Sequence, residues 1–484
     1  MLLTGHNRYV PLIVACIVFI SSLGYFHKAL LSLPVGRFSS IEGAFASAPP
    51  ASNHHHENAD GDNNHDDNAD GDNNHDDNDL LPPPPKQAGN ISPPRAPDGS
   101  LSHVVLRSLS TPDHRYFPLR FGGHPKFLNP NILPHPSFND TWIIVAQRGA
   151  SPLPSSIWFS ELVCNAQFRS GALACVEVPA ILPIPATFGS KCTGDIEYYA
   201  RFQGPRDARV FYGPSNPLAT FGSVGTQTTC LAQWTQDFRL LVDWGYEDLS
   251  TAVFRAATEL HRPDRYGAVE KNWFMFWDAE GNYYVHYDVA PNRVFAKLNI
   301  DGTVGPDLAP TAAPTDAKCL AARMPVSRSP AQAVHQATNS LSVTMCARAE
   351  ADCTATPANT FIFVIFQQKT YAQFHSVYEP YVMMFRQTAP FELHAISTKP
   401  LWVYGRGGAG EGLRPPNFPE GGEWEQTEMF YVTSMSWKER GRKYHGHVDD
   451  VLLIAFGIED ERAGAIDILA GDLFAEMGLC AEVV

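Results

Sequence analysis

The chain has 484 residues, of which 44% are hydrophobic and 18% charged, and its formal net charge is −15. Ten of the acidic residues fall within residues 51–80, which contain no Lys or Arg, so the rest of the chain carries only about −5. The sequence has no basic stripe and its charge has the wrong sign for binding nucleic acid, so no nucleic-acid partner is expected.

The first predicted element is a membrane-spanning helix over residues 9–26, which are 18 residues without a charge. Such a run is just long enough to cross a hydrocarbon core of about 30 Å as a helix. We predict a retained signal-anchor, with a cytosolic tail at residues 1–8 and the remainder translocated. The alternative is a cleaved signal peptide, but the small-residue sites at residues 44–48 lie far from the apolar run.

Residues 27–100 are predicted to be a disordered acidic and Pro-rich stem. Residues 58–67 repeat letter for letter as residues 68–77, and four consecutive prolines follow at 82–85. A tract with so little apolar surface cannot offset the entropy lost on folding. Its two Asp-Gly-Asp triplets mimic a metal-binding DxD motif, but a flexible repeat offers no rigid metal site. No DxD follows residue 98, so no metal and no cofactor are expected.

The cysteine pattern predicts an oxidising compartment. One of the nine cysteines, Cys16, lies in the apolar run, and no pair has the CxxC spacing of zinc or redox sites. The other eight form an even set, which indicates disulfides of undetermined pairing, with buried free thiols as the alternative. Two N-glycosylation sequons, at Asn90 and Asn139, fit the same compartment, although a proline follows the first.

Residues 101–484 are predicted to be one lumenal, all-β domain. Short runs rich in aromatic and β-branched residues recur along it, bounded by Gly, Pro, Asp and Asn. A propeller is favoured over a sandwich because closing short strands in a ring leaves few open edges. Few segments carry helical periodicity, and the best short ones are residues 252–261 and 469–477. The expected strands are residues 142–147, 238–242, 273–277, 283–287, 293–300, 361–366, 381–385, 429–435 and 451–456.

The first candidate site is Glu247 and Asp248, which follow the expected strand 238–242 in the sequence Gly-Tyr-Glu-Asp. Acidic side chains at a strand end suit general acid/base chemistry, because partial burial raises a carboxyl pKa toward neutrality. The alternative is a turn that ends the strand and caps the helix-like segment after it.

The second candidate site is Glu270, Lys271, Asn272 and Trp273, at the start of the expected strand 273–277. The polar side chains could hold hydroxyl or phosphate oxygens, and the indole offers a flat face for a sugar. The alternative is a salt-bridged strand start. A third candidate is Asp460, in the Phe-Gly-Ile-Glu-Asp segment that ends the last expected strand, although we favour a simple turn there.

His445 and His447, with the neighbouring Asp449 and Asp450, form a further group that could ligate a metal. Two histidines at i and i+2 on a strand face the same way, as a metal site needs. A solvated loop that enters a strand explains the same residues, and we favour it.

The order and spacing of these motifs resemble the five-bladed propellers of glycoside hydrolase family 130 and the related eukaryotic β-mannosyltransferases. The resemblance rests on Gly-Tyr-Glu-Asp, Glu-Lys-Asn-Trp with its following hairpin, and Phe-Gly-Ile-Glu-Asp, over residues 130–480. Asn216, in Gly-Pro-Ser-Asn-Pro, is similar to the Asn-Pro turn of an early blade. The resemblance implies an all-β, five-bladed β-propeller.

The resemblance also implies roles for residues. In the family's phosphorylases the Asp of a G-x-E-D-P-R motif is the proton donor, which falls on Asp248, with Glu247 beside it. Leu249 and Ser250 stand where that motif has Pro and Arg, which argues against use of inorganic phosphate. The substrate-binding residues implied are Glu270, Lys271, Asn272, Trp273, Asn216 and Asp460.

The sequence therefore predicts a single-pass type II Golgi glycosyltransferase, an inverting mannosyltransferase that acts on a glycan acceptor. Its donor would be a sugar nucleotide or sugar phosphate, used without a metal. Two alternatives remain open, a glycoside hydrolase or phosphorylase acting on β-mannosides and a non-catalytic carbohydrate-binding propeller. Display at the plasma membrane and secretion are the alternatives for its location.

Overall fold

The computed structural model describes residues 90–484, except 124–125, 154, 188–190, 227–229, 244–248, 264, 373–374, 416–417 and 419–421. The predicted cytosolic tail, signal-anchor and most of the stem, with both Asp-Gly-Asp triplets, lie outside the described residues. In the part of the chain that is described, no helix has the length and apolar character to cross a membrane.

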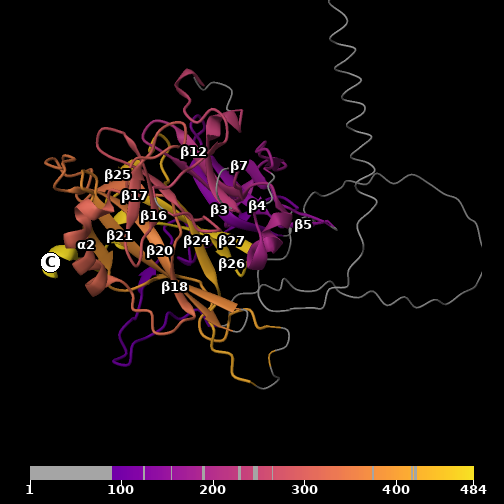
Figure 1. The fold of residues 1–484 in the computed structure, drawn as a ribbon. Helices are drawn as coiled ribbons and strands as arrows, with labels where there is room; N and C mark the ends of the chain where they lie inside the picture. The colour runs from indigo at the N-terminus through magenta and orange to yellow at the C-terminus, as the bar shows by residue number, and fades with distance from the viewer. Residues whose placement is uncertain are drawn as a thin grey trace, which may run out of the picture. The chain divides into compact units, whose positions relative to one another are not determined.

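The described residues form an all-β, propeller-like fold whose main strands fall into five successive groups (Figure 1). The first group is β3 (Phe127–Pro134), β4 (Trp142–Arg148), β7 (Glu161–Arg169) and β8 (Ala172–Cys175). The second is β11 (Arg206–Tyr212), β12 (Pro217–Val224), β13 (Leu231–Asp237) and β14 (Thr258–Glu259). The third is β15 (Phe274–Trp277), β16 (Tyr283–Asp288) and β17 (Val294–Lys297).

The last two groups complete the ring. The fourth is β18 (Gln332–Gln336), β19 (Leu341–Thr344), β20 (Thr360–Ala372), β21 (His375–Arg386), β22 (Leu393–Ser397) and β28 (Met477–Leu479). The fifth is β24 (Phe430–Trp437), β26 (Val451–Ile458) and β27 (Arg462–Leu469). Shorter elements are β1 (Val104–Leu106), β5 (Ser151–Pro152), β6 (Ile157–Trp158), β9 (Ala180–Ile181), β10 (Phe202–Gln203), β23 (Leu401–Val403), β25 (His445–His447), η2 (Gly194–Arg201), η4 (Leu249–Thr251), α3 (Ala470–Leu473) and η5 (Cys480–Glu482).

Strand β2 (Phe117–Arg120) joins the first group to the last. It pairs antiparallel with β27 and parallel with β8, so that the two groups become one continuous sheet. A strand from near the beginning of the described residues thus covers the edge of the final group, which is how a closed ring avoids open sheet edges.

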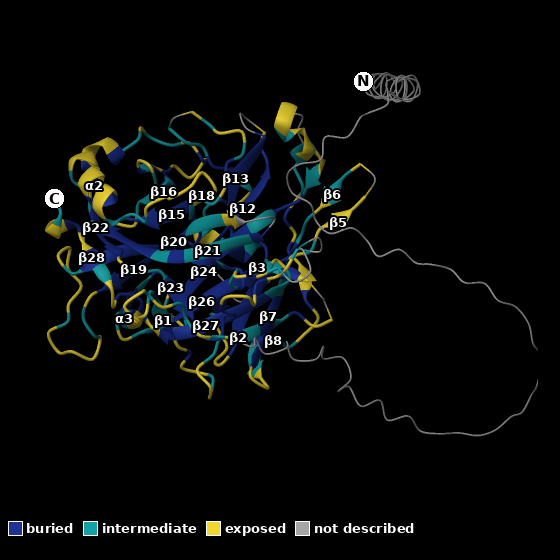
Figure 2. Cartoon of the chain, turned by 90° about the horizontal axis from the view of Figure 1, so that it is seen from below, coloured by how far each residue is buried: buried dark blue, intermediate teal, exposed yellow. Residues whose placement is uncertain are grey.

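Neighbouring groups pack face to face, which explains why their strands are apolar on both faces. All eight residues of β12 are buried, and β3 contacts both β11 and β24. Aromatic and β-branched side chains suit such surfaces. Figure 2 shows buried residues concentrated in the strands, while exposed ones lie in loops and on α2 (Ala309–Arg323).

The strand predictions are confirmed at eight of nine places, with boundaries shifted by a few residues, and are wrong at residues 238–242. There β13 ends at Asp237 and η3 (Phe238–Leu240) follows as a 3-10 turn. The Asp237 carboxylate accepts a hydrogen bond from Arg239 N and pairs with its guanidinium at 2.7 Å. This cap fixes the turn and ends the strand.

The helix prediction at residues 252–261 is also wrong, because that segment contains β14, which pairs with β13. The structure has instead a helix that was not predicted, α2, whose sequence contains Pro310 and Pro314. Proline in the first turn is tolerated, since the N–H it lacks has no partner there, but it obscures the helical pattern.

The expectation of disulfides is confirmed, because all eight cysteines of the described part are paired. The pairs are Cys164–Cys175, Cys192–Cys230, Cys319–Cys480 and Cys346–Cys353. Such bonds form and persist in the secretory pathway and outside the cell, which indicates a secretory or lumenal compartment.

Candidate functional site

The two predicted catalytic residues, Glu247 and Asp248, lie outside the described residues, so their roles stay predictions. The described residues on either side of them contact the turn between β11 and β12. Asp237 pairs with Leu218 at the start of β12, and Thr251 O accepts a 3.0 Å hydrogen bond from Asn216 Nδ2. Asn216 is buried in this turn, which follows the C-terminal end of β11.

The predicted group at residues 270–273 divides between the interior and the surface. Glu270 is buried and pairs with Arg262 at 3.1 Å, and Arg262 in turn pairs with Asp288. Gly267 N also donates to the Glu270 carboxylate. These contacts match the salt-bridged strand start that the sequence left open as an alternative.

Trp273 belongs to the core, since only 4% of its surface is exposed and its ring meets the Tyr287 ring edge-on at 4.7 Å. This burial does not favour the predicted role as a flat face for a sugar. Asn272 adopts a left-handed backbone (φ 62°) and its carbonyl accepts from Gln336 Nε2. The turn at Asn272 directs the chain from the exposed Lys271 into the buried strand β15.

Lys271 and Asp460 belong to a different environment from Glu270, Trp273 and Asn216. Both are exposed, and both act electrostatically on Lys369, near the tip of the β20–β21 hairpin. The structure thus brings together two residues that are 189 positions apart in the printed sequence. The remaining residues of this region were not predicted.

We call this region the carboxylate–lysine cluster. It gathers residues from the first, second, fourth and fifth groups and from the loop before β15, all partly or fully accessible to solvent. Its members are Asn129, Asp207, Lys271, His335, Lys369, Tyr378, Tyr431 and Asp460.

Asp207 is held in place from three sides. Asn129 Nδ2 donates to its carboxylate at 2.6 Å, and its own N–H donates to Gln147 Oε1 at 2.8 Å. Arg209 donates to the Asp207 carbonyl at 3.0 Å and to Ala337 O at 2.8 Å. Asp207 has φ 53°, at a register shift between β11 and β12. A strained backbone conformation of this kind persists only where surrounding contacts fix it, and such conformations are common at functional sites.

Asp460 has a raised pKa, chiefly because burial by the surrounding chain disfavours its charge, and then because of Asp207 and Glu459. Lys369 opposes this effect. The pKa of Lys369 is itself lowered, first by burial and then by the charge of Lys271. Carboxylates and amines that interact electrostatically in this way are candidates for proton transfer and for binding charged substrates.

His335 and two tyrosines complete the cluster. Burial, Lys271 and Lys369 lower the pKa of His335 to about 4, so its imidazole is neutral at physiological pH. The Tyr378 and Tyr431 rings meet edge-on at 4.8 Å, and Lys369 Nζ lies 5.7 Å from the Tyr378 ring centroid. Burial raises the pKa of both phenols, which therefore remain hydrogen-bond donors.

Two buried acids lie directly behind the cluster. Glu161 accepts from Ala208 N, and burial raises its pKa to about 8, so it is neutral at pH 7. Glu459 pairs with His375 at 3.1 Å and accepts from Leu413 N and Met429 N. Glu459 therefore anchors the loop before β24 beside Asp460.

A sequence signal for Asp207 did exist. Asp207-Ala208-Arg209 has the spacing of Asp and Arg in G-x-E-D-P-R, with Ala in place of Pro, and it begins a strand. The segment at residues 245–248 matches the motif better at its start, because only that segment has Gly, Glu and Asp together.

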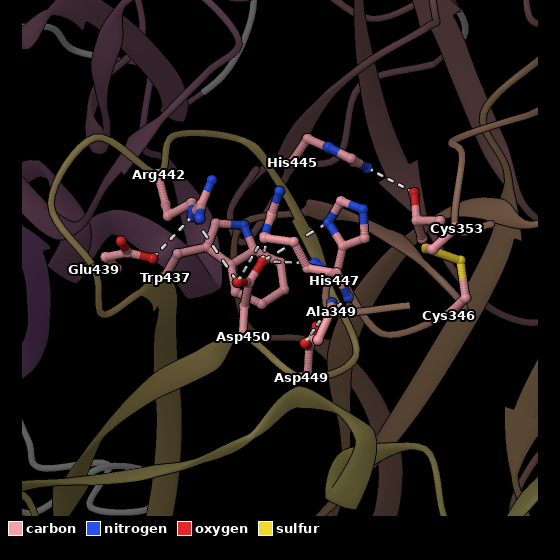
Figure 3. A network of polar contacts seen from close by, with 12 residues as sticks. Cys346, Ala349, Cys353, Trp437, Glu439, Arg442, His445, His447, Asp449 and Asp450 are labelled. Carbon is pink, nitrogen blue, oxygen red and sulfur yellow. Dashed lines mark hydrogen bonds and ion pairs between the residues drawn. A yellow bond between two sulfur atoms is a disulfide. The ribbon is translucent and has the colours of Figure 1, made fainter. Parts of the chain in front are cut away.

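The histidines at 445 and 447 are part of a polar network (Figure 3). They lie on β25, which pairs with β19, and not in a solvated loop. Asp449 accepts from Arg348 N and Ala349 N, and Asp450 pairs with Arg348 at 2.6 Å. The carboxylates are thus already bonded, and within the described ranges no group of three or more His, Cys, Asp or Glu could hold a metal ion.

The chain was compared with known proteins. No family model and no curated protein matches it. Solved structures that are similar include a β-1,2-mannobiose phosphorylase from Listeria innocua, with 10% identity, TM-score 0.35 and coverage of 72% of this chain and 96% of that chain. A GDP-Man-dependent mannosyltransferase from Leishmania mexicana has 8% identity, TM-score 0.34 and coverage of 73% and 88%. A hypothetical protein from Leishmania major has 13% identity, TM-score 0.36 and coverage of 73% and 90%.

These neighbours include both kinds of protein that the sequence motifs resemble, a phosphorylase and a mannosyltransferase. At such TM-scores the similarities carry no argument about activity or substrate. The propeller-like description of this chain rests on its own strand pairing, and its candidate site rests on the contacts above.

Proposed function

We propose that this chain is a carbohydrate-active enzyme, a membrane-anchored glycosyltransferase of five-bladed propeller fold that moves mannose with inversion onto a glycan acceptor. The observation that carries the proposal is the carboxylate–lysine cluster. It gathers two carboxylates, two amines and two phenols from separate strands and loops in one solvent-accessible region. The proposal includes a Golgi location, with the candidate site in the lumen. The disulfides support a secretory or lumenal compartment but do not distinguish the Golgi from others.

Asp207 is our candidate for the base that takes the proton of the acceptor hydroxyl. Its carboxylate is oriented by Asn129 and its backbone by Gln147 and Arg209. A base held in this way meets the geometric demand of proton transfer without reorganising during the reaction. Asp248 remains the competing candidate, on the motif resemblance alone.

Lys271 and Lys369 are our candidates for binding the phosphate of an activated donor. Within the described residues neither forms an ion pair with a carboxylate. The charge of Lys271 contributes to lowering the pKa of Lys369, and a phosphate between the two amines would relieve this repulsion. As the bond from the sugar to the phosphate breaks, the same amines would neutralise the charge left on the phosphate. This arrangement supports use of a sugar nucleotide or sugar phosphate without a metal.

The direct test is to incubate the purified full chain with sugar-nucleotide donors and mannose-containing oligosaccharides, in the presence of a chelator. We expect a product one hexose longer and release of the nucleotide. The absence of any product across donors, together with release of monosaccharide from oligosaccharide alone, would instead establish a hydrolase.

One observation favours phosphorolysis as a second candidate. Arg209 supplies the basic residue of Asp-x-Arg that the segment at 247–250 lacks, which removes the main sequence argument against use of inorganic phosphate. Arg209 is, however, already bonded to three backbone carbonyls. Adding phosphate to the oligosaccharide incubation distinguishes this candidate, because only a phosphorylase would yield a sugar phosphate.

A further inference from the structure

A cavity lies at the other end of the strands from Asp460. It has a volume of about 1190 Å³ and lies where β3 ends, β4 begins and β24 leads toward β26. Strand β26 starts at this cavity with Val451 and ends at Ile458, just before Asp460. Eight residues of extended chain span roughly 25 Å, so the cavity is well separated from the carboxylate–lysine cluster.

Asn139, in one of the two sequons, lines this cavity. It is exposed in the turn between β3 and β4, and no hydrogen bond is formed by its side-chain amide within the described part of the chain. Thr141, the sequon hydroxyl residue, donates from Oγ1 to the Asn139 carbonyl at 3.0 Å. The fold therefore leaves the Asn139 amide nitrogen open to carry a substituent.

Asn90, in the other sequon, is placed differently. Its carbonyl accepts a 2.6 Å hydrogen bond from Gly408 N, and its N–H donates to Glu411 at 3.1 Å. A Cβ on Gly408 would lie 3.1 Å from Asn90 Nδ2, so the amide fits against a residue without a side chain. A glycan on that nitrogen would displace this contact.

We propose that Asn139, and not Asn90, carries an N-linked glycan, and that its first sugars lie in the cavity beside it. The cavity offers the exposed ring of Phe138 and the half-buried ring of Phe168 for sugar faces, and the Lys438 amine for hydroxyls. The paired cysteines place the chain in a compartment where such glycans are attached.

The attachment is a simple transfer. A bond forms between Asn139 Nδ2 and C1 of the first sugar, and the amide loses one proton. The bond from C1 to the lipid-linked diphosphate carrier of the cell's glycosylation machinery breaks, and the diphosphate leaves with the electron pair. The modification does not depend on the proposed transferase activity, so the two ideas can fail separately.

The test is to express the full chain in cultured eukaryotic cells as wild type, Asn139→Gln and Asn90→Gln. Asn139→Gln should migrate faster on a denaturing gel by one glycan, and amidase digestion should no longer shift it. Asn90→Gln should match the wild type before and after digestion. An unchanged mobility of Asn139→Gln, or loss of one glycan in Asn90→Gln, would overturn the assignment.

Seating of the first sugars in the cavity has its own readout. Digestion of the wild type by an N-glycan amidase should be at least about tenfold slower on the folded protein than on the denatured protein, since burial protects the linkage. Equal rates in the two states would show that the glycan extends into solvent and would overturn this part of the proposal.

Discussion

Asp460 combines exposure to solvent with an unfavourable electrostatic environment. Although its side chain reaches the surface, the chain around it partly desolvates the carboxylate and, with Asp207 and Glu459, disfavours its charge, and only Lys369 offsets this. A charged residue in such surroundings lowers the stability of the fold, so its presence indicates a role in binding or chemistry.

Replacing Asp460 by Asn should therefore raise the Tm at pH 7 while lowering transferase activity. Because the pKa of Asp460 is raised in the folded state, the folded protein binds this proton more tightly than the unfolded chain does, and stability falls as pH rises past the ordinary Asp pKa. The Tm difference between variant and wild type should shrink as the pH is lowered toward 4. A lower Tm for Asp460→Asn at pH 7, measured by calorimetry, would contradict this reading.

Glu161 makes a second prediction at the residue scale. Its pKa of about 8 means that the folded state keeps a proton that the unfolded state releases above about pH 4.5. The contribution of Glu161 to stability is thus complete below about pH 4.5 and is lost as pH rises to about 8, at up to about 1.4 kcal/mol for each pH unit.

The variant Glu161→Gln keeps the acceptor for Ala208 N and removes the titration. Denaturant unfolding at several pH values should give a flatter stability profile for the variant than for the wild type between pH 5 and 8. Parallel profiles for the two proteins would show that Glu161 does not titrate in this range.

At the scale of elements, strand β25 is fitted closely to β24. A Cβ added at Gly446 would lie 2.5 Å from atoms of the Trp437 ring, which is completely buried. We expect Gly446→Ala to lower the free energy of unfolding by about 1–3 kcal/mol, as overpacking does. Gly305→Ala is the matched control, because the nearest atom to its Cβ would be 4.0 Å away. Similar losses in both variants would contradict the packing argument.

The elements also show what the sequence could and could not predict. Runs such as those in β20 and β26 were recognisable because a strand buried on both faces is apolar and β-branched throughout. The closing strand β2 was not recognisable from the sequence, since four residues carry little pattern. One of its two partner strands, β27, also lies more than 300 positions further along the chain.

The same limit applies to the candidate site. Lys271 and Asp460 were predicted from local motifs, whereas Lys369 and Tyr378 lie near the tip of a long hairpin, where no sequence motif marks them as functional. Local sequence likewise could not tell that Glu270 and Trp273 point into the interior while Lys271 stays outside. Convergence of residues from separate groups depends on the ring, and no short motif encodes it.

At the scale of the whole molecule, Cys319–Cys480 ties α2 to the end of the chain across 161 residues, whereas Cys346–Cys353 spans only 7. Loop-closure entropy gives about 5 kcal/mol for the long loop and about 2 kcal/mol for the short one. We expect the double variant Cys319→Ser/Cys480→Ser to lose more stability to denaturant than Cys346→Ser/Cys353→Ser. A larger loss of stability in Cys346→Ser/Cys353→Ser would show that loop length does not determine how much each disulfide stabilises the fold.

The central claim is that the carboxylate–lysine cluster, with Asp207 as its base, is where the reaction takes place. Single-turnover transfer by the full chain measures it most directly, with wild type compared with Asp207→Asn, Asp248→Asn and the exposed control Asp301→Asn. We expect a loss of at least about a hundredfold for Asp207→Asn, as for a missing general base, and wild-type rates for Asp301→Asn. Full activity in a folded Asp207→Asn protein, with loss in Asp248→Asn instead, would contradict it.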